Sequence, residues 1–374
     1  MGRLSSQLGF CISILLITFT SHSDDRIYKV NTRPNEIKIM AYNLQNMFDS
    51  RHDETKGEHK NDYQFLPKSS KWKQYCPAGN YYQSCLDTDW TSKKVKIKIQ
   101  RVKEALELQG SLPDILALSE VENPNVVGKL AKALGYDDYY MTDSPDKRGI
   151  DLAVLYLKEK MTAIDYVEVE LEESMYPTRN ASAVHFRLSE QMGGGVLGVY
   201  PVHWPSQRGP VQARIYAAKT VRNLVNAEKR KYRNETYQAV VLGDFNVTEE
   251  DSPHPVRSVL LDRGWSNQFL STRELATHNN HPHLDKMPPG TYYYGPKNLW
   301  NMFDQLLVTK SLQDGVGLEV MPKSYRIHAP KKISQENDHG ERIPFRYNHR
   351  TDEQKWMGYS DHYAVHVKLR FKRD

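Results

Sequence analysis

Residues 239–246 read Ala-Val-Val-Leu-Gly-Asp-Phe-Asn. The first five form a short apolar run that ends at a glycine, which is typical of a buried strand. Asp244 and Asn246 follow at once, so two oxygen-bearing side chains stand at the end of that predicted strand. A plain turn explains them equally well, because Asp and Asn bond to their own backbone in turns. The stretch therefore indicates a functional site only if other predicted strands also end in polar side chains.

Polar side chains do stand at one end of four other predicted strands. These are 37–43 with Asn43, 114–119 with Glu120, 195–203 with His203, and 363–371 preceded by Asp361 and His362. Strand ends in a rigid sheet are good places to hold a site. Carboxylate and amide oxygens are the ligands that a hard divalent cation prefers, and histidines can move protons. The set lacks the Cys and His spacing of a zinc site.

Strand-like and helix-like segments alternate from residue 37 to the end, without an internal repeat. Further strands are expected at 151–156 and 304–308, and helices at 125–134, ended by Gly135, and 212–232. The stretch 93–108 mixes strand and helix periods before it settles to helix spacing. Because no clean β-α-β rhythm appears, we predict two β-sheets packed face to face with helices outside.

The composition is that of an ordinary globular protein. Of 374 residues, 39% are hydrophobic and 26% are charged, which excludes a largely disordered chain and a fibrous repeat. The length suits one large domain or two smaller ones. Lys and Arg outnumber Asp and Glu by 51 to 46, a formal net charge of +5. So small an excess permits a nucleic acid or an anionic lipid as partner and favours neither.

The first 23 residues have the pattern of a secretory signal peptide. One charge, Arg3, precedes an apolar run at 8–17, and small residues follow towards Ser23. A membrane anchor is the alternative, but the run is shorter than the roughly 20 residues that span a bilayer. No later segment of the sequence is long and apolar enough to span one. We expect a secreted or periplasmic protein, with one domain over 24–374.

Removal of the signal peptide leaves two cysteines, Cys76 and Cys85. In an exported protein they predict one disulfide that closes a small loop. Two free thiols are the alternative, and two thiolates without a nearby histidine pair do not make a metal site. Both cysteines lie in the polar, aromatic and turn-rich segment 50–92, which we interpret as a long insertion.

Seven motifs together resemble the endonuclease/exonuclease/phosphatase superfamily, the group of pancreatic deoxyribonuclease, AP endonucleases, bacterial sphingomyelinases and inositol polyphosphate 5-phosphatases. They follow the family's order over about residues 37–370, and they look most like an exported bacterial, endonuclease-like subgroup. The motifs are Tyr-Asn-Leu at 42–44, Leu-Ser-Glu-Val-Glu-Asn at 118–123, Arg-Gly-Ile-Asp-Leu-Ala-Val-Leu-Tyr at 148–156, Val-His-Trp-Pro-Ser at 202–206, Gly-Asp-Phe-Asn at 243–246, Asp-Gln-Leu-Leu at 304–307 and Ser-Asp-His-Tyr at 360–363.

The resemblance implies a four-layer α-β-β-α sandwich with two mixed sheets and helices on both outer faces. It also implies hydrolysis of phosphoesters with Mg²⁺, or with Mn²⁺ or Ca²⁺ in its place. In that family pattern Glu120 is the main metal ligand, supported by Asn43 and Asp361. Glu122 would point the same way as Glu120 in a regular strand, and we rank it second.

The resemblance also assigns catalytic roles. Asp244 positions or deprotonates the attacking water, and Asn246 beside it contacts the phosphate. Asp304 holds His362 in one tautomer, and His362 then bonds a phosphate oxygen or shares in proton transfer. His203 bonds the phosphate or helps the leaving oxygen depart. Whether Asp244 or His362 is the base stays open at this stage.

Three arginines lie near these motifs. Arg148 and Arg214 are candidates for contacts to the substrate phosphate, since Arg presents a planar fork of donors. A solvated surface arginine is the alternative for each, and we favour it for Arg208. Asp151 begins a strand inside a family motif, so we expect it to support structure more than to bind a metal.

For the substrate, the leading hypothesis is DNA or RNA, cut by a secreted endonuclease that acts as a monomer without a stable protein partner. Basic runs at 93–98 and 229–233 could attract a polyanion, although solvated helix faces explain them at least as well. Aromatic loops at 81–82 and 292–294 could stack bases or equally pack the loops. A phospholipid, sphingomyelin or inositol phosphate is the alternative substrate on the same fold. A non-catalytic binding protein is a third hypothesis, but no motif residue is missing.

Overall fold

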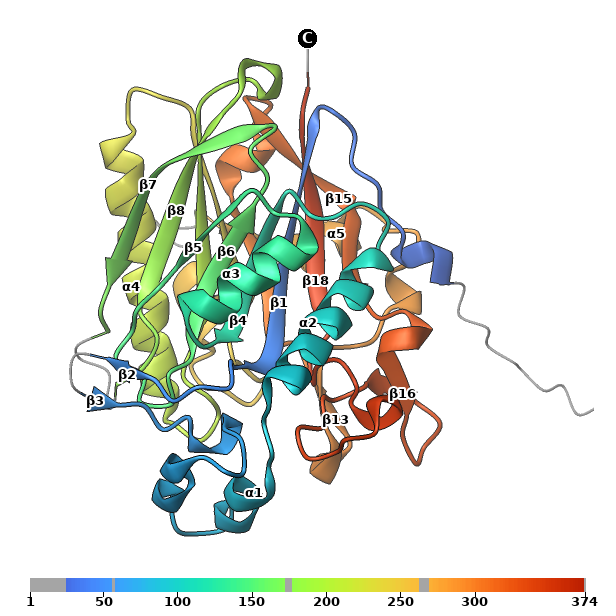
Figure 1. Cartoon of the computed structure of the whole chain (residues 1–374). Helices are drawn as coiled ribbons and strands as arrows, with labels where there is room; N and C mark the ends of the chain where they lie inside the picture. Colours follow the sequence, from blue (N-terminus) through green and yellow to red (C-terminus); the bar gives the residue numbers. More distant parts are fainter. Residues whose placement is uncertain (1–24, 56–57, 172–176, 262–268, 373–374) are drawn as a thin grey trace, which may run out of the picture.

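The computed structural model describes residues 25–55, 58–171, 177–261 and 269–372 (Figure 1). The predicted signal peptide, residues 1–23, lies outside these ranges. Within them, no helix has the length and apolar character needed to cross a membrane.

Two six-stranded mixed sheets form the centre of the molecule. The first has the order β15-β18-β1-β4-β6-β5, and the second has the order β11-β14-β10-β9-β8-β7. In each sheet one central pair is parallel, β1 with β4 and β10 with β9, and the other pairs are antiparallel. The strands are β1 (Glu36–Met47), β4 (Ile115–Val121), β5 (Asp138–Met141), β6 (Asp151–Tyr156), β7 (Met161–Val169), β8 (Ala181–Leu188), β9 (Val196–His203), β10 (Tyr237–Asp244), β11 (Phe269–Ser271), β14 (Asp304–Thr309), β15 (Leu318–His328) and β18 (Ala364–Phe371).

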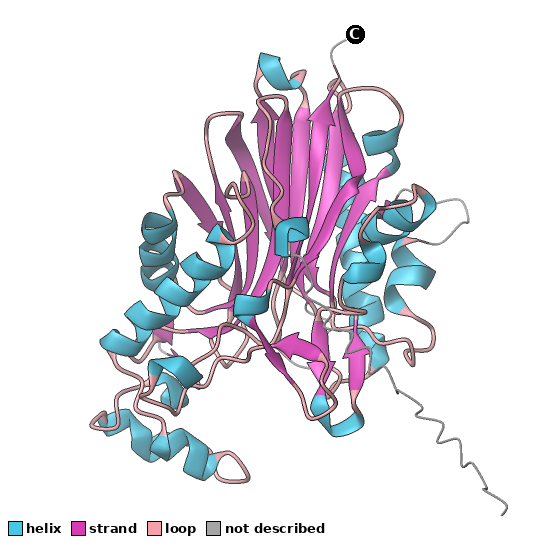
Figure 2. Ribbon diagram, turned by 90° about the vertical axis from the view of Figure 1, so that its right-hand side faces the viewer, coloured by secondary structure: helices cyan, strands magenta, loops and turns pink. Residues whose placement is uncertain are grey.

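Helices cover the outer faces of both sheets, so the strands lie between two helical layers (Figure 2). Helices α2 (Ser92–Glu107) and α3 (Pro124–Leu134) pack on the first sheet, and α4 (Val211–Lys231) packs on the second. A shorter helix, α5 (Thr272–His278), contacts β14 and β15. The predicted α-β-β-α sandwich is therefore confirmed.

Local sequence explains where the helices begin and end. At the start of α3 the Asn123 side chain accepts a hydrogen bond from the Val126 N–H at 3.0 Å, and Pro124 fills the first turn. At its end Gly135 takes the left-handed conformation, with φ of 86°, in which glycine carries no steric cost. The helix predicted at 125–134 is thus confirmed, together with its glycine stop.

The ambiguous stretch 93–108 belongs to α2, and its lysines are not all at the surface. Lys98 is fully buried, and its amine donates to the carbonyls of Gln45 at 2.5 Å and Asn46 at 3.2 Å. Lys94 is also buried, on the same face. The basic run that we read as a possible polyanion contact is therefore partly a structural element that holds the end of β1.

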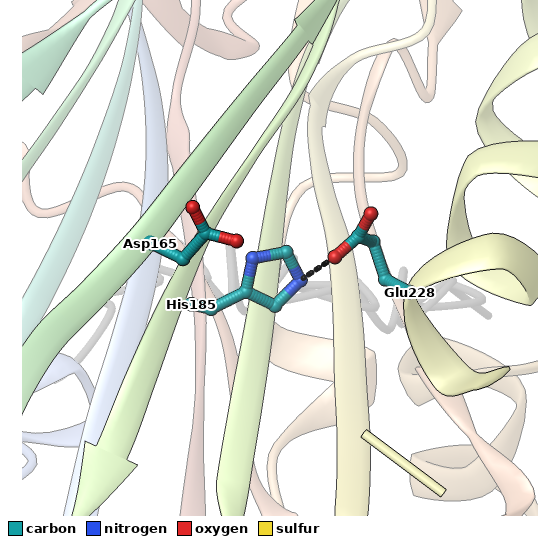
Figure 3. Close-up of side chains that lie close together, drawn as sticks. All are labelled: Asp165, His185 and Glu228. Atoms are coloured by element: carbon teal, nitrogen blue, oxygen red, sulfur yellow. Dashed lines mark ion pairs between the residues drawn. The ribbon is translucent and has the colours of Figure 1, made fainter. Parts of the chain in front are cut away.

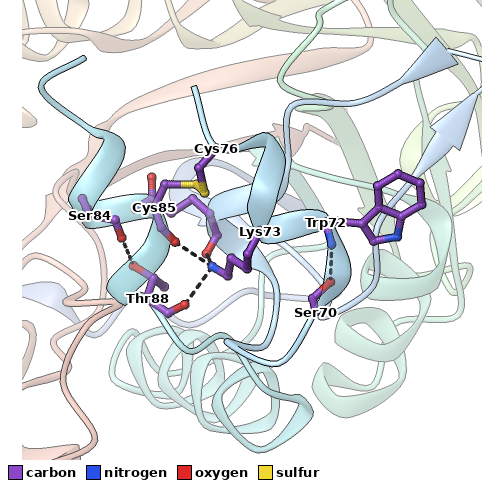
Figure 4. The surroundings of a disulfide bond; sticks show 8 residues. Ser70, Trp72, Lys73, Cys76, Ser84, Cys85 and Thr88 are labelled. Atoms are coloured by element: carbon purple, nitrogen blue, oxygen red, sulfur yellow. Dashed lines mark hydrogen bonds between the residues drawn. A yellow bond between two sulfur atoms is a disulfide. The ribbon is translucent and has the colours of Figure 1, made fainter. Parts of the chain in front are cut away.

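The insertion at 50–92 folds into short elements closed by the predicted disulfide between Cys76 and Cys85 (Figure 4). They are β2 (Glu54–Thr55), β3 (Glu58–His59), two 3-10 turns (Tyr63–Phe65 and Lys71–Tyr75) and α1 (Tyr82–Asp87). The buried amine of Lys73 donates to the carbonyls of Cys85 at 2.7 Å and Thr88 at 2.8 Å. These bonds and the disulfide tie the loop together from within.

Acidification should destabilise the fold, because histidines are buried in uncharged form. His328 is 1% exposed, with its Nε2 2.9 Å from the Ala105 carbonyl oxygen. Burial, aided by the nearby charge of Lys38, lowers the pKa of His328 to about 4 although the Ala105 carbonyl raises it. The unfolded chain binds its proton near pH 6.5, so stability is complete above that pH and is lost as pH falls towards 4, by about 3 kcal/mol for this residue alone.

Urea unfolding at pH 7 and pH 4.5 measures this loss. The His328→Gln variant, which keeps a side-chain N–H for the Ala105 carbonyl, should show a smaller drop than the wild type. An equal drop in both proteins would contradict the role given to His328.

Candidate active site

Register in the second sheet places three of the predicted site residues side by side. Asp244, the last residue of β10, lies opposite His203 of the parallel strand β9 and opposite Asp304 of the antiparallel strand β14. Gly243 precedes it with φ of 132°, and a Cβ added there would lie 2.1 Å from the Val202 carbonyl oxygen. Only glycine lets the two strands approach this closely just before Asp244.

The first sheet contributes Asn43 and Glu120 through irregular strand ends. The pairing of β4 with β6 shifts between Ser119 and Val121, and Glu120 takes a left-handed φ of 60°. Such a conformation is unfavourable for glutamate and is held by its surroundings. Here the Asn46 N–H donates to Glu120 Oε2 at 2.9 Å. The bulge thus aims the Glu120 carboxylate at the end of the second sheet.

The same bulge breaks the alternation that we expected to align Glu122 with Glu120. Glu122 is buried elsewhere, where its Oε2 accepts the Asp49 N–H at 2.7 Å. Its carboxyl lines a separate cavity of about 620 Å³ beside the insertion. The two glutamates therefore point in different directions, because the strand is not regular at this place.

Asn43 connects the two sheets at the site. Its side-chain amide donates to Asp244 Oδ2 at 3.1 Å and lies 3.4 Å from Glu120 Oε1, while its Oδ1 accepts the Gln45 N–H at 2.9 Å. The Ser360 hydroxyl in turn donates to the Asn43 carbonyl at 2.7 Å. The amide therefore fixes the spacing of the two carboxylates.

A buried pair of Asp304 and His362 lies beside Asp244. His362 Nδ1 is 2.7 Å from Asp304 Oδ2, and His362 Nε2 is 4.0 Å from Asp244 Oδ2. Burial opposes the charged ring, but Asp304, Asp244 and Asp361 outweigh it and raise the pKa of His362 to about 10. The imidazole is therefore held protonated, with Nδ1 facing Asp304 and Nε2 free to donate towards the cleft.

His203 is the opposite case. Its Nε2 lies 3.7 Å from Asp244 Oδ2 and 3.8 Å from Glu120 Oε1. Burial, together with the charges of Arg179, Arg148 and His362, lowers its pKa well below the usual value. The site therefore contains one neutral and one protonated imidazole, on either side of Asp244.

The donor set fits a divalent cation. Glu120, Asp244 and Asp361 line one cleft at the ends of the two sheets, and Arg346 lies 3.1 Å from Asp361. Burial and the charge of Glu120 raise the pKa of Asp361, although His362 and Arg346 lower it. Crowded carboxylates of this kind favour a bound cation, and their oxygens suit Mg²⁺ or Mn²⁺. Glu120 and Asp361 are the residues that would hold it, whereas Asn43, predicted as a further ligand, turns its NH2 group towards Glu120 and Asp244 and its oxygen towards the Gln45 N–H.

All these groups open into a cleft of about 710 Å³. Besides the site residues, cationic and aromatic side chains line it. They include Arg148, Arg208, Lys297, Tyr292, Tyr294 and Phe303. Arg148 is more than half exposed, with only a 3.7 Å contact to Asp146, so its guanidinium is available to a ligand.

One sequence expectation changes here. Arg214 does not line the cleft: it is 2% exposed and bonded to Asp251 at 2.7 Å and to the Ser206 carbonyl at 3.0 Å, so its guanidinium organises the loop after β9. Arg208, which we favoured as a surface residue, is exposed; it also lines the cleft and donates to the Tyr81 hydroxyl of the insertion at 2.8 Å. Asn246 also lines the cleft, with a left-handed φ of 50°.

The sequence profile of the Endonuclease/Exonuclease/phosphatase family matches residues 38–371. The chain belongs to this family. A search of curated proteins found no match to the chain.

Solved structures of this family and related proteins share the fold at low identity. A Bacteroides thetaiotaomicron endonuclease/exonuclease/phosphatase family protein aligns with 91% of this chain and 100% of its own, at 16% identity and a TM-score of 0.52. A humanized D. rerio TDP2 aligns with 90% of this chain and 99% of its own, at 14% identity and a TM-score of 0.53. A mannosyl-6-phosphatase from Bacteroides thetaiotaomicron aligns with 90% of this chain and 100% of its own, at 15% identity and a TM-score of 0.50.

Arg179 supports the site from behind His203, and the sequence motifs did not indicate it. It is 5% exposed, and it donates from Nε to the His203 carbonyl at 3.0 Å and from Nη2 to the Trp204 carbonyl at 2.7 Å. Its Nη1 donates to Asp146 Oδ2 at 2.9 Å. The side chain thus fixes the backbone that presents His203. It precedes a strand without a motif of its own, so nothing in the local sequence pointed to it.

The Arg179→Gln variant should lose about 3 kcal/mol of unfolding free energy, because it leaves Asp146 buried without its main partner. Phosphoesterase turnover should also fall, since the backbone at His203 loses two hydrogen bonds. Urea unfolding and a rate assay measure both effects. The exposed Arg208→Gln variant is the control for stability and should lie within about 0.5 kcal/mol of wild type. Wild-type stability of Arg179→Gln would contradict this role.

Proposed function

We propose that this protein is a divalent-metal-dependent phosphodiester hydrolase, a secreted endonuclease that acts on DNA or RNA. The observation that carries the proposal is the His362–Asp304 pair, 2.7 Å apart, next to Asp244 and Glu120 in one open cleft. The phosphoesterase fold of the family gives the reaction class, and the disulfide between Cys76 and Cys85 supports export, since such bonds persist in oxidising compartments.

The site residues answer the main difficulty of the reaction, which is the negative charge of the phosphodiester. His362 donates from Nε2 to a phosphoryl oxygen, and Asp304 keeps it protonated while charge builds in the transition state. A bound divalent cation would add Lewis-acid stabilisation of the same charge. Neutral His203, on the other side of Asp244, contacts the phosphate without adding a fixed charge.

We assign the general base to Asp244. His362 holds its proton at neutral pH, so it cannot accept one from water. Burial and the charge of Asp304 raise the pKa of Asp244, although His362 lowers it, and a raised pKa makes the carboxylate a better proton acceptor. Asn43 orients this carboxylate through its 3.1 Å hydrogen bond to Oδ2. In-line attack then proceeds with the base on one face of the phosphorus and the leaving oxygen on the other.

The cleft walls support a nucleic acid over a lipid. Tyr292 stacks on Phe303, with ring centroids 5.0 Å apart and planes at 20°, and it also lies 5.0 Å from the ring of His362. Arg148 and Lys297 line the same cleft and suit the flanking phosphates of a polymer. Aromatic side chains beside cationic ones are typical of surfaces that bind single strands by stacking.

A substrate panel tests the proposal. The mature chain, with Mg²⁺, is assayed on supercoiled plasmid, single-stranded RNA, sphingomyelin vesicles and an inositol polyphosphate. We expect kcat/KM for the plasmid or for the RNA to exceed the values for sphingomyelin and for the inositol polyphosphate by at least about 10²-fold. Preferential hydrolysis of sphingomyelin or of the phosphomonoester would overturn the nuclease proposal and leave the phosphoesterase assignment standing.

A further inference from the structure

Three metal-ligand side chains converge on the outer face of the second sheet, away from the cleft. They are Asp165 on β7, His185 on β8 and Glu228 on α4, and Figure 3 shows the imidazole between the two carboxylates. His185 pairs with Gly198, five residues before His203 along β9. At about 3.3 Å per residue, the cluster lies roughly 16 Å from the catalytic histidine. It belongs to no motif used so far.

The spacing of the ligand atoms suits a single ion. One atom from each side chain lies within 4.8 Å of one atom of both others. His185 Nε2 is 3.6 Å from Glu228 Oε2, too far for a hydrogen bond, and 3.2 Å from the Tyr237 hydroxyl. With Nε2 bonded to Tyr237, the unpartnered Nδ1 is the nitrogen left to bind an ion. Around tetrahedral Zn²⁺, with bonds of 2.0–2.1 Å, neighbouring ligand atoms are about 3.4 Å apart. The observed separations of up to 4.8 Å would have to shorten for the three side chains to bind one ion.

Two atoms of the cluster are buried without a hydrogen-bond partner among the described residues, His185 Nδ1 and Glu228 Oε2. His185 is fully buried, and Glu228 is 8% exposed. Buried polar atoms normally have partners, so two orphans in one cluster indicate a missing ligand.

Lys231 now supplies the positive charge of the cluster. Its amine pairs with Asp165 and lies 3.6 Å from Glu228 Oε2. About half of the Lys231 side chain is exposed, so the ammonium can move into solvent when another cation replaces it. Tyr237 provides an outer hydrogen bond, with its hydroxyl 3.2 Å from His185 Nε2.

We propose that Asp165, His185 and Glu228 form a second metal site, for one Zn²⁺ or a similar transition ion, with water completing the coordination. The ion displaces Lys231 from the two carboxylates. Because the ligands come from the edge strand β7, its neighbour β8 and the covering helix α4, the bound ion joins these three elements. The ion therefore stabilises this side of the sheet and takes no part in the hydrolysis.

The test uses Co²⁺ as a spectroscopic probe, added to the protein after a chelator has removed any bound metal. The Glu120→Gln background weakens ion binding at the cleft, so the visible absorption of Co²⁺ reports the second site. We expect bands that Zn²⁺ removes on addition, and a melting temperature that Zn²⁺ raises. The further change His185→Gln should weaken binding at least about tenfold, whereas Lys231→Met should tighten it. Lys229→Met, on the same helix, is the matched control and should leave binding unchanged.

Absence of Co²⁺ bands in the Glu120→Gln chain would overturn the proposal whether or not the His185→Gln variant folds. Binding that His185→Gln leaves intact in a folded protein would overturn it too. If Co²⁺ bound only after Lys231→Met, the lysine ammonium would be the cation that neutralises the two carboxylates in the native chain. That result would also overturn the proposed metal site.

Discussion

Replacing Asp244 by asparagine is expected to reduce kcat for phosphodiester hydrolysis by about 10²–10⁴-fold, the usual contribution of a general base. The amide has the shape of the carboxylate and can still lie against Asn43, but it cannot accept a proton from water. Binding of the polymer depends mainly on the cleft walls, so KM should change little. Rates of plasmid nicking under saturating substrate measure the effect, with circular dichroism to confirm the fold.

The control for this experiment is Asp143→Asn. Asp143 is exposed and lines the separate cavity beside the insertion, so its charge lies outside the catalytic set. Near-wild-type rates are expected for it. If Asp244→Asn retained more than a tenth of the wild-type rate, Asp244 would not be the base, and the protonation state assigned to His362 would also be in error.

Replacing Glu120 by glutamine should change the dependence of the reaction on metal. A neutral amide is a poorer ligand for Mg²⁺ than a carboxylate, and the bulge holds this side chain in one direction. We expect the Mg²⁺ concentration for half-maximal rate to rise at least about tenfold, with a lower maximal rate. Metal titrations of both proteins on one substrate measure the shift.

Glu122→Gln is the matched control, because this glutamate lies two residues away and faces a different cavity. Burial and the charge of Asp49 raise its pKa well above the usual value, although the Asp49 N–H lowers it, so an amide resembles its protonated form. Its metal titration should overlay that of the wild type. A shift for Glu122→Gln but not for Glu120→Gln would show that the ion binds in the other cavity.

Much of the fold was predictable because apolar periodicity reports burial directly. The strand at 239–243 and the helix at 125–134 are buried on the faces that their sequences indicate. Strands β7 and β8 were missed: β7 is an edge strand with a partly exposed face, so its apolar pattern is weak. The lysine run at 93–98 misled us because a buried amine bonded to carbonyls, as at Lys98, has the same sequence signature as a solvated one.

The site residues that lie in family motifs were predictable from the sequence. The direction in which a side chain points depends on three-dimensional pairing and was less predictable. The structure brings Asn43, Glu120, His203, Asp244 and His362 together, as the resemblance implied. The bulge that separates Glu120 from Glu122 depends on pairing with β6, which no local pattern records. Arg214 and Arg179 show the same limit, since a buried structural arginine and one that contacts substrate look alike in sequence.

Hydrolysis of nucleic acid in this cleft should require both a divalent cation and Asp244. The most direct measurement is nicking of supercoiled plasmid by the purified mature chain with Mg²⁺, with EDTA, and with the Asp244→Asn variant in Mg²⁺. We expect conversion to open circles in the first reaction and none above background in the other two. Nicking that persists in EDTA, or failure of the folded wild-type chain to cut either the plasmid or single-stranded RNA, would rule this mechanism out.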